Sequence, residues 1–132
     1  MAKKILSKLF YSFIYALIIS LFASLILHIT REGFEVFQTV ILTTLINIFL
    51  CIINFISSLT ALLNLKLEIR DHKVLSLLSY FGFPILILIF IISFLIYKNM
   101  TAEFPQILMI LIPSTSYIIS LFYNFNNIDK IK

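Results

Sequence analysis

Charged residues are scarce in this chain of 132 residues. They make up 12% of the sequence, whereas a typical globular domain carries about 25%. Hydrophobic residues make up 61%, and water cannot solvate a protein surface of that composition. A lipid bilayer can, so the composition excludes an ordinary soluble domain and predicts an all-α membrane protein.

Cysteine is nearly absent as well. The only one, Cys51, lies inside an apolar run. A single cysteine excludes an intramolecular disulfide, and a thiol in hydrocarbon stays protonated, so we expect Cys51 to be a packing residue. The sequence shows no metal-ligand or nucleophile motif, and Asp71-His72 fits a solvated turn. We therefore expect no enzyme activity, no cofactor and no metal site.

Four long apolar segments alternate with short charged ones. The second, Val36 to Leu65, runs for thirty residues without Asp, Glu, Lys, Arg, Gly or Pro. A bilayer core about 30 Å thick needs about 20 apolar residues of helix. We expect one four-helix transmembrane domain over residues 1–132, built as two antiparallel hairpins. The expected spans are 9–30, 36–65, 74–97 and 105–124.

The second span is too long for one upright crossing. Thirty residues of helix at about 1.5 Å each reach about 45 Å, so this helix must tilt or protrude. Residues 64–73 hold no glycine or proline that would force a break. The helix could therefore continue into the water before the chain turns.

Lysine and arginine are distributed unevenly between the two sides of the expected bundle. Eight lie on the side of the termini: Lys3, Lys4, Lys8, Lys66, Arg70, Lys73, Lys130 and Lys132. Two, Arg31 and Lys98, lie on the other side. Positive residues collect on the cytoplasmic side, so we expect both termini there, in a bacterial cytoplasmic (inner) membrane. The basic surface is too small for nucleic acid.

One side of the second span is polar. Asn47 and Asn54 are seven residues apart and differ by about 20° around a helix. Thr43, Cys51 and Ser58 lie within about 40° of Asn47. Lipid offers no hydrogen bonds, so this face should turn towards protein or water. Two interpretations stay open, helix–helix contact and the lining of a pore or ligand cavity.

The first span carries a ridge of small residues at intervals of four: Ser12, Ala16, Ser20 and Ser24. Small residues let membrane helices approach closely. Each step of four drifts by about 40° around the helix, so we expect only part of the ridge to be used. We expect Ala16, Ser20 and Ser24 to contact the asparagine face.

Two prolines lie inside the later spans. Pro84 and Pro113 each remove one backbone hydrogen bond near the middle of a span. The hydroxyls of Ser114, Thr115 and Ser116 follow Pro113 and could bond to freed carbonyls. With Asn47 at a similar depth, these residues suggest a polar midplane layer, which many transporters use as a binding site. The alternative is two kinks repaired by neighbouring hydroxyls.

Two functions compete on this evidence. The first is a small accessory or regulatory membrane protein: an assembly factor, a complex subunit or an immunity-type protein. It would act through helix–helix and loop contacts in the bilayer, with another membrane protein or with copies of itself. The alternative is an oligomeric channel or small-solute transporter using the midplane layer. His28, near the outer boundary, is the one ionisable side chain in the spans, which argues against a proton-coupled pump.

Overall fold

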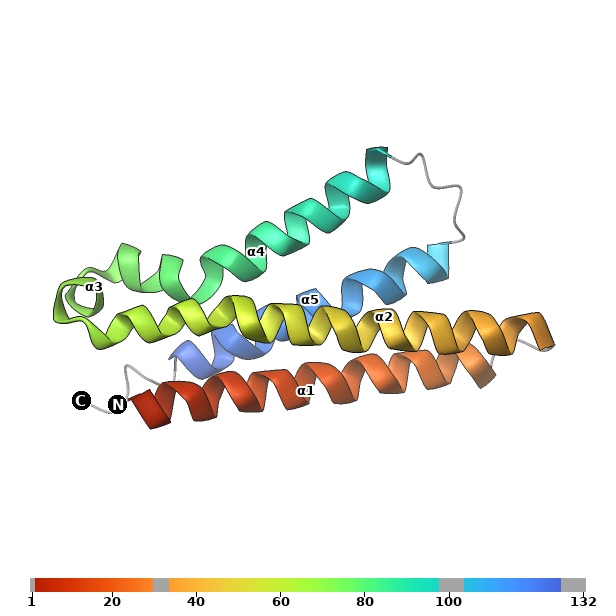
Figure 1. Ribbon diagram of the computed structural model, residues 1–132, viewed down its shortest axis with the longest axis horizontal. Helices are drawn as coiled ribbons and strands as arrows, with labels where there is room; N and C mark the ends of the chain where they lie inside the picture. The colour runs from red at the N-terminus through yellow and green to blue at the C-terminus, as the bar shows by residue number, and fades with distance from the viewer. Residues whose placement is uncertain (1, 30–33, 98–103, 127–132) are drawn as a thin grey trace.

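A computed structural model describes residues 2–29, 34–97 and 104–126. The described chain is all helical (Figure 1). Its elements are α1 (Ala2–Ile29), α2 (Phe34–Ser58), the 3-10 helix η1 (Leu59–Leu65), α3 (Leu67–Asp71), α4 (Lys73–Tyr97) and α5 (Phe104–Asn126). Within these residues, four segments are long and apolar enough to cross a membrane: Ala2–Ile26, Val40–Leu65, Lys73–Tyr97 and Ile107–Phe125.

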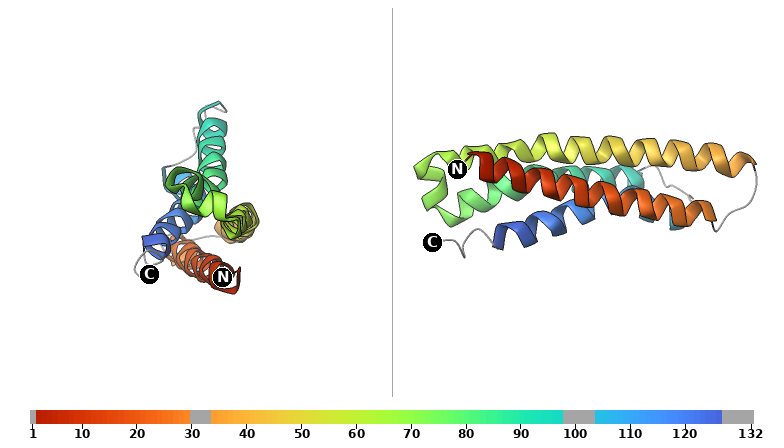
Figure 2. Two further views of the ribbon diagram at one scale, coloured as in Figure 1. Left: turned by 90° about the vertical axis from the view of Figure 1, so that its left-hand side faces the viewer. Right: turned by 90° about the horizontal axis from the view of Figure 1, so that it is seen from below.

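The long helices form a bundle with α2 and α5 at its centre. Helix α1 packs against both of them, and α4 packs against α2, η1 and α5. The start of α1, the end of α5 and the short helix α3 lie at one end of the molecule (Figures 1 and 2). Four residues of the charge count, Arg31, Lys98, Lys130 and Lys132, lie outside the described residues, as does the side chain of His28.

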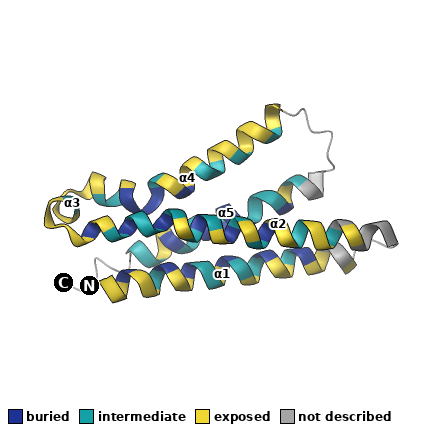
Figure 3. Cartoon of the chain, in the orientation of Figure 1, coloured by how far each residue is buried: buried dark blue, intermediate teal, exposed yellow. Residues whose placement is uncertain are grey.

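The interior of the bundle holds many polar residues beside its apolar ones, whereas large apolar side chains are exposed over its surface. Figure 3 shows how far each residue is buried. The buried polar residues are Ser12, Ser20, Ser24, Asn47, Asn54, Ser58, Asn64, Ser79, Ser114 and Ser116. Large apolar side chains such as Phe22, Phe49 and Phe90 are more than half exposed. Buried polar groups beneath a largely apolar surface fit a bilayer, where only protein can satisfy polar groups.

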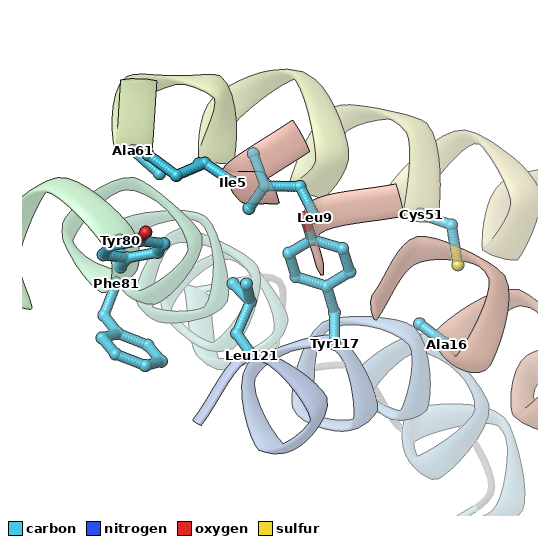
Figure 4. Close-up of a cluster of buried hydrophobic side chains, with 9 residues drawn as sticks. All are labelled: Ile5, Leu9, Ala16, Cys51, Ala61, Tyr80, Phe81, Tyr117 and Leu121. Carbon is cyan, nitrogen blue, oxygen red and sulfur yellow. The ribbon is translucent and has the colours of Figure 1, made fainter. Parts of the chain in front are cut away.

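An apolar core fills the end of the bundle near the start of α1 (Figure 4). Aromatic rings anchor α4 to α5 there. Tyr80 and Phe81 lie edge-on to Phe125, with ring centroids 5.1 Å and 5.8 Å apart. Between α1 and α2, Phe13 and Phe55 are 5.3 Å apart. The edge-to-face contacts of Phe125 add to the energy of simple burial.

The second span does not continue as one α-helix into residues 64–73. It becomes the 3-10 helix η1, and the backbone is extended at Lys66 and again at His72. Side chains explain the change, because they bond to carbonyls three residues earlier: Ser57 to Asn54, Ser58 to Phe55, Thr60 to Ser57 and Asn64 to Ala61. Such local bonds compete with the regular α-helical pattern and favour a tighter turn.

The two halves of α4 differ in their packing. Ser79, Tyr80, Phe81 and Pro84 are buried in its first half. From residue 85 to residue 97, no residue is buried. In Figure 1 this second half diverges from α2 and α5. Packing of α4 against the bundle therefore stops at Pro84, the residue that cannot donate a backbone hydrogen bond.

Candidate functional site

The polar face of α2 bonds first to α1. The Asn47 side-chain nitrogen donates to the Ser24 hydroxyl, 3.3 Å away. One turn later, the Cys51 sulfur lies 3.7 Å from the Ser20 hydroxyl oxygen. Both residues of α2 are completely buried. The asparagine face and the small ridge of α1 therefore meet along one turn of helix.

The same face then bonds to α5. The Asn54 side-chain nitrogen donates to the Ser114 hydroxyl at 3.0 Å and to the Leu50 carbonyl of its own helix at 2.8 Å. One turn further, the Ser58 hydroxyl forms a hydrogen bond with the Tyr117 hydroxyl. Asn54, Ser58 and both partners on α5 are buried.

The last bonds of this face reach α4. The Asn64 side-chain nitrogen donates to the Ser79 hydroxyl, and the Thr60 hydroxyl donates to the Ser79 carbonyl at 2.9 Å. We call Asn47, Cys51, Asn54, Ser58 and Asn64 the polar ladder. It joins α2 and η1 to each of the other three long helices in turn.

Asn64 reaches the polar ladder because η1 is a 3-10 helix. In a continuous α-helix, Asn64 would lie about 80° from Asn54. With three residues per turn after Ser58, the angle falls to about 40°. The sequence pattern did not identify Asn64 because it was read with the α-helical period throughout.

All four members of the small ridge on α1 are buried. We expected only part of it to be used, because the ridge winds around the helix. Its members meet different neighbours instead. Ser12 accepts a hydrogen bond from the Asn124 side chain of α5 at 2.9 Å, whereas Ser20 and Ser24 face α2. Because the ridge winds around α1, its first part faces α5 and its later part faces α2.

The predicted midplane residues do not form one layer around Asn47. Asn54, not Asn47, contacts Ser114. Asn47 lies seven residues, about 10 Å, closer to the start of α2. The reason is length: α2 and η1 together run from Phe34 to Leu65, whereas α5 runs only from Phe104 to Asn126. The excess length of α2 lies at its start, as Figure 1 shows.

The two prolines and the remaining predicted residues are placed as follows. Pro84 and Pro113 are both fully buried, and Thr43 is half-buried. Thr115 donates to the Leu111 carbonyl at 2.9 Å and Ser116 to the Ile112 carbonyl at 2.6 Å. Pro113 frees the carbonyl of Met109, but the bonded carbonyls lie two and three residues beyond it. The reason is that a hydroxyl reaches back only three or four residues.

Among the described residues, three asparagines have a buried side-chain oxygen without a hydrogen-bond partner: Asn47, Asn54 and Asn64. Their serine partners explain two of them. Ser24 and Ser79 already donate their single hydroxyl proton to backbone carbonyls, at 3.0 Å and 2.8 Å. They can only accept a bond from the asparagine nitrogen, so the asparagine oxygen stays unpaired.

Several of these contacts had no signal in the sequence. Tyr117, Asn124 and Lys8 all bond across helices, the last to the Asn124 carbonyl at 3.1 Å. Among the described residues, no group of three His, Cys, Asp or Glu side chains is arranged to hold a metal ion. Comparison with protein-family models, curated proteins and solved structures finds no match to this chain.

Proposed function

We propose that this chain is a small accessory or regulatory membrane protein that binds an apolar transmembrane helix of a larger membrane protein. The observation that carries the proposal is a groove of about 850 Å³ between α4 and α5. Leu78, Gly82 and Ile85 line it from α4, and Ile118 and Phe122 from α5. Its walls are apolar, so its ligand is apolar too.

Gly82 makes this groove suited to a helix. Apart from its two chain neighbours and the backbone of its own helix, nothing lies within 4 Å of the position that a β-carbon at Gly82 would occupy. Small residues are the ones that let membrane helices approach closely. An α-helix about 10 Å wide fills roughly 400 Å³ per turn. The groove therefore takes about two turns of a partner helix.

The unpacked half of α4 extends the same surface. Beyond Pro84, the side chains of Phe90 and Ile96 are 71% and 70% exposed. The polar ladder, in contrast, is directed at the protein's own helices. We infer that the ladder holds the bundle together and that α4 and α5 offer the surface for a partner. An assembly factor, a small subunit and an immunity-type protein would all use such a surface.

The proposal includes two antiparallel hairpins with both termini in the cytoplasm, in a bacterial cytoplasmic membrane. The charge distribution supports this orientation. The first hairpin is supported by the bonds from Asn47 to Ser24 and from Cys51 to Ser20, which pair α1 and α2 in opposite sequence directions.

Photo-crosslinking in native membranes tests the partner. A photoreactive amino acid at Leu86, in the groove, should yield an adduct with one integral membrane protein, identified by mass spectrometry. Gly82→Leu should abolish this adduct by filling the groove, whereas Gly82→Ala should preserve most of it. The new side chain faces open space, so helical content should not change.

The matched control for this experiment is Phe49, which is 62% exposed on α2. The same photoreactive group there should give no such adduct. An adduct only between copies of this chain would make the partner a second copy. Adducts only with lipid, at both positions, would overturn the proposal.

One observation favours the alternative, an oligomeric channel or small-solute transporter. The unpaired oxygens of Asn47, Asn54 and Asn64 are spaced along one face of α2 and η1. In an oligomer that opened the bundle, they would be acceptors for water or a solute. Ion flux through liposomes containing the purified protein, altered by Asn47→Leu, would establish this function.

A further inference from the structure

A second groove, of about 510 Å³, lies between α1 and α5. Tyr11, Tyr15 and Ile18 line it from α1, and Ile119, Tyr123 and Asn124 from α5. It differs from the groove between α4 and α5 because its walls are apolar at one end and carry hydroxyl and amide groups at the other. Its ligand must therefore combine an apolar part and a polar part.

The wall formed by α1 changes in chemistry along its length. Lys4, Lys8, Tyr11, Tyr15 and Ile18 fall within about 40° of Lys4 around the helix. Along the helix, this stripe begins with two cations, continues with two phenols and ends with one aliphatic side chain. A charged end, a hydrogen-bonding middle and an apolar end are thus aligned on one stripe.

The wall formed by α5 changes in the same direction. Asn124 and Tyr123 lie towards the lysine end, and Ile119 lies towards the apolar end. Lys8 fixes the polar end by donating to the Asn124 carbonyl at 3.1 Å. Its ammonium group has three protons, so two remain for a ligand. A cation at the last turn of α5 also suits the helix dipole.

The tyrosines are not distributed like an ordinary aromatic belt, which surrounds a membrane protein at the interface. Four of the six tyrosines are exposed, and three of these, Tyr11, Tyr15 and Tyr123, line this single groove. At the same end of the molecule, η1 and the start of α4 expose aliphatic residues such as Leu63 and Val74. The position of the phenols therefore marks this groove in particular.

We propose that the groove between α1 and α5 binds one anionic phospholipid. Its acyl chain lies between Ile18 and Ile119, its ester region lies at the tyrosine hydroxyls, and its phosphate lies at Lys4 and Lys8. The lysines select a headgroup with net negative charge over a zwitterionic one. Ile119 also lines the groove between α4 and α5, and the other lining residues of the two grooves differ.

Native mass spectrometry of the detergent-purified full chain tests the site. With phosphatidylglycerol as the probe, one lipid should be retained at lower concentration than with phosphatidylcholine of the same acyl chains. A lysine near an anionic surface changes affinity by about fivefold. Lys4→Gln with Lys8→Gln should therefore weaken phosphatidylglycerol binding by about 25-fold. Phosphatidylcholine binding should fall by a clearly smaller factor, because its choline cation offsets the charge of its phosphate. Inorganic phosphate should not compete at millimolar concentration, because it lacks the acyl chain.

The matched control removes two positive charges elsewhere at the same end, in Lys66→Gln with Lys73→Gln, and should change binding by less than twofold. If the Lys8 variant is misfolded by circular dichroism, Lys4→Gln alone, at an exposed residue, should still weaken binding by about fivefold. Equal binding of both lipids would overturn the proposal. So would equal losses in the two double variants, since these would show attraction to overall charge rather than to this groove.

Discussion

At the scale of single residues, the asparagines of the polar ladder work as donors. Asn47 and Asn64 each meet a serine whose proton is already bonded to a carbonyl of its own helix. Hydrogen bonds between membrane helices average about 0.6 kcal/mol in measured cases. One such bond decides little, so the stability of the bundle depends on repeating the contact along α2.

A double-mutant cycle on Asn54 and Ser114 tests this estimate. Asn54→Leu and Ser114→Ala should each destabilise the protein, and together by less than the sum, with a coupling of about 0.6 kcal/mol. The free energy of unfolding in mixed micelles titrated with denaturing detergent gives the four values. Asn54→Leu combined with Ser93→Ala, at an exposed serine of α4, should be additive. Additivity for Asn54 and Ser114 as well would show that the bond contributes nothing.

At the scale of elements, local geometry decides which faces meet. The ridge of α1 turns by about 40° at each step, and this lets Ser12 face α5 while Ser20 and Ser24 face α2. The change from α to 3-10 at Ser58 brings Asn64 towards the polar face. The contacts of α1 and of η1 therefore both differ from those expected for a straight helix with one regular period.

The native cysteine provides a test of the pairing between α1 and α2. Ser20→Cys should form a disulfide with Cys51 under mild oxidation, because the two side-chain atoms are 3.7 Å apart and a disulfide needs only a small further approach. Loss of free thiol, measured by mass after alkylation, reports the bond. Ile18→Cys, which replaces a residue of the groove between α1 and α5, should leave Cys51 free. A free thiol at both positions in the folded Ser20→Cys protein would contradict the pairing.

At the scale of the whole molecule, the distribution of charge sets the expected orientation in the membrane. Lys3, Lys4 and Lys8 belong to the first turns of α1, and Lys66, Arg70 and Lys73 surround α3. These two segments lie at the same end of the bundle (Figure 1). Six of the ten positive residues are thus at one end, which we expect to be cytoplasmic.

Reporter fusions at the C-terminus test this orientation. A green fluorescent protein should fluoresce there, and an alkaline phosphatase should be inactive, because the first folds in the cytoplasm and the second requires export. Replacing Lys3, Lys4 and Lys8 with glutamine should weaken the preference. An active phosphatase at the C-terminus of the unaltered chain would refute the cytoplasmic placement.

Much of the fold could be read from the sequence, and less of the candidate site. Solvation depends on local composition, so long apolar runs with few charges sufficed to predict an all-helical protein with four helices long and apolar enough to span a membrane. The two-sided character of α2 also followed from the spacing of Asn47 and Asn54 on a regular helix. These properties depend on residues close together in the chain.

Only the tertiary structure decided which helix each polar residue meets and where the surface stays open. Ser114 lies sixty residues from Asn54, and their contact depends on the relative lengths of α2 and α5. The 3-10 helix that brings Asn64 to the polar face arises because side chains bond to backbone carbonyls. A pattern read with the α-helical period does not take these bonds into account. The two grooves depend on how far neighbouring helices separate, and side-chain packing over the whole bundle sets that distance.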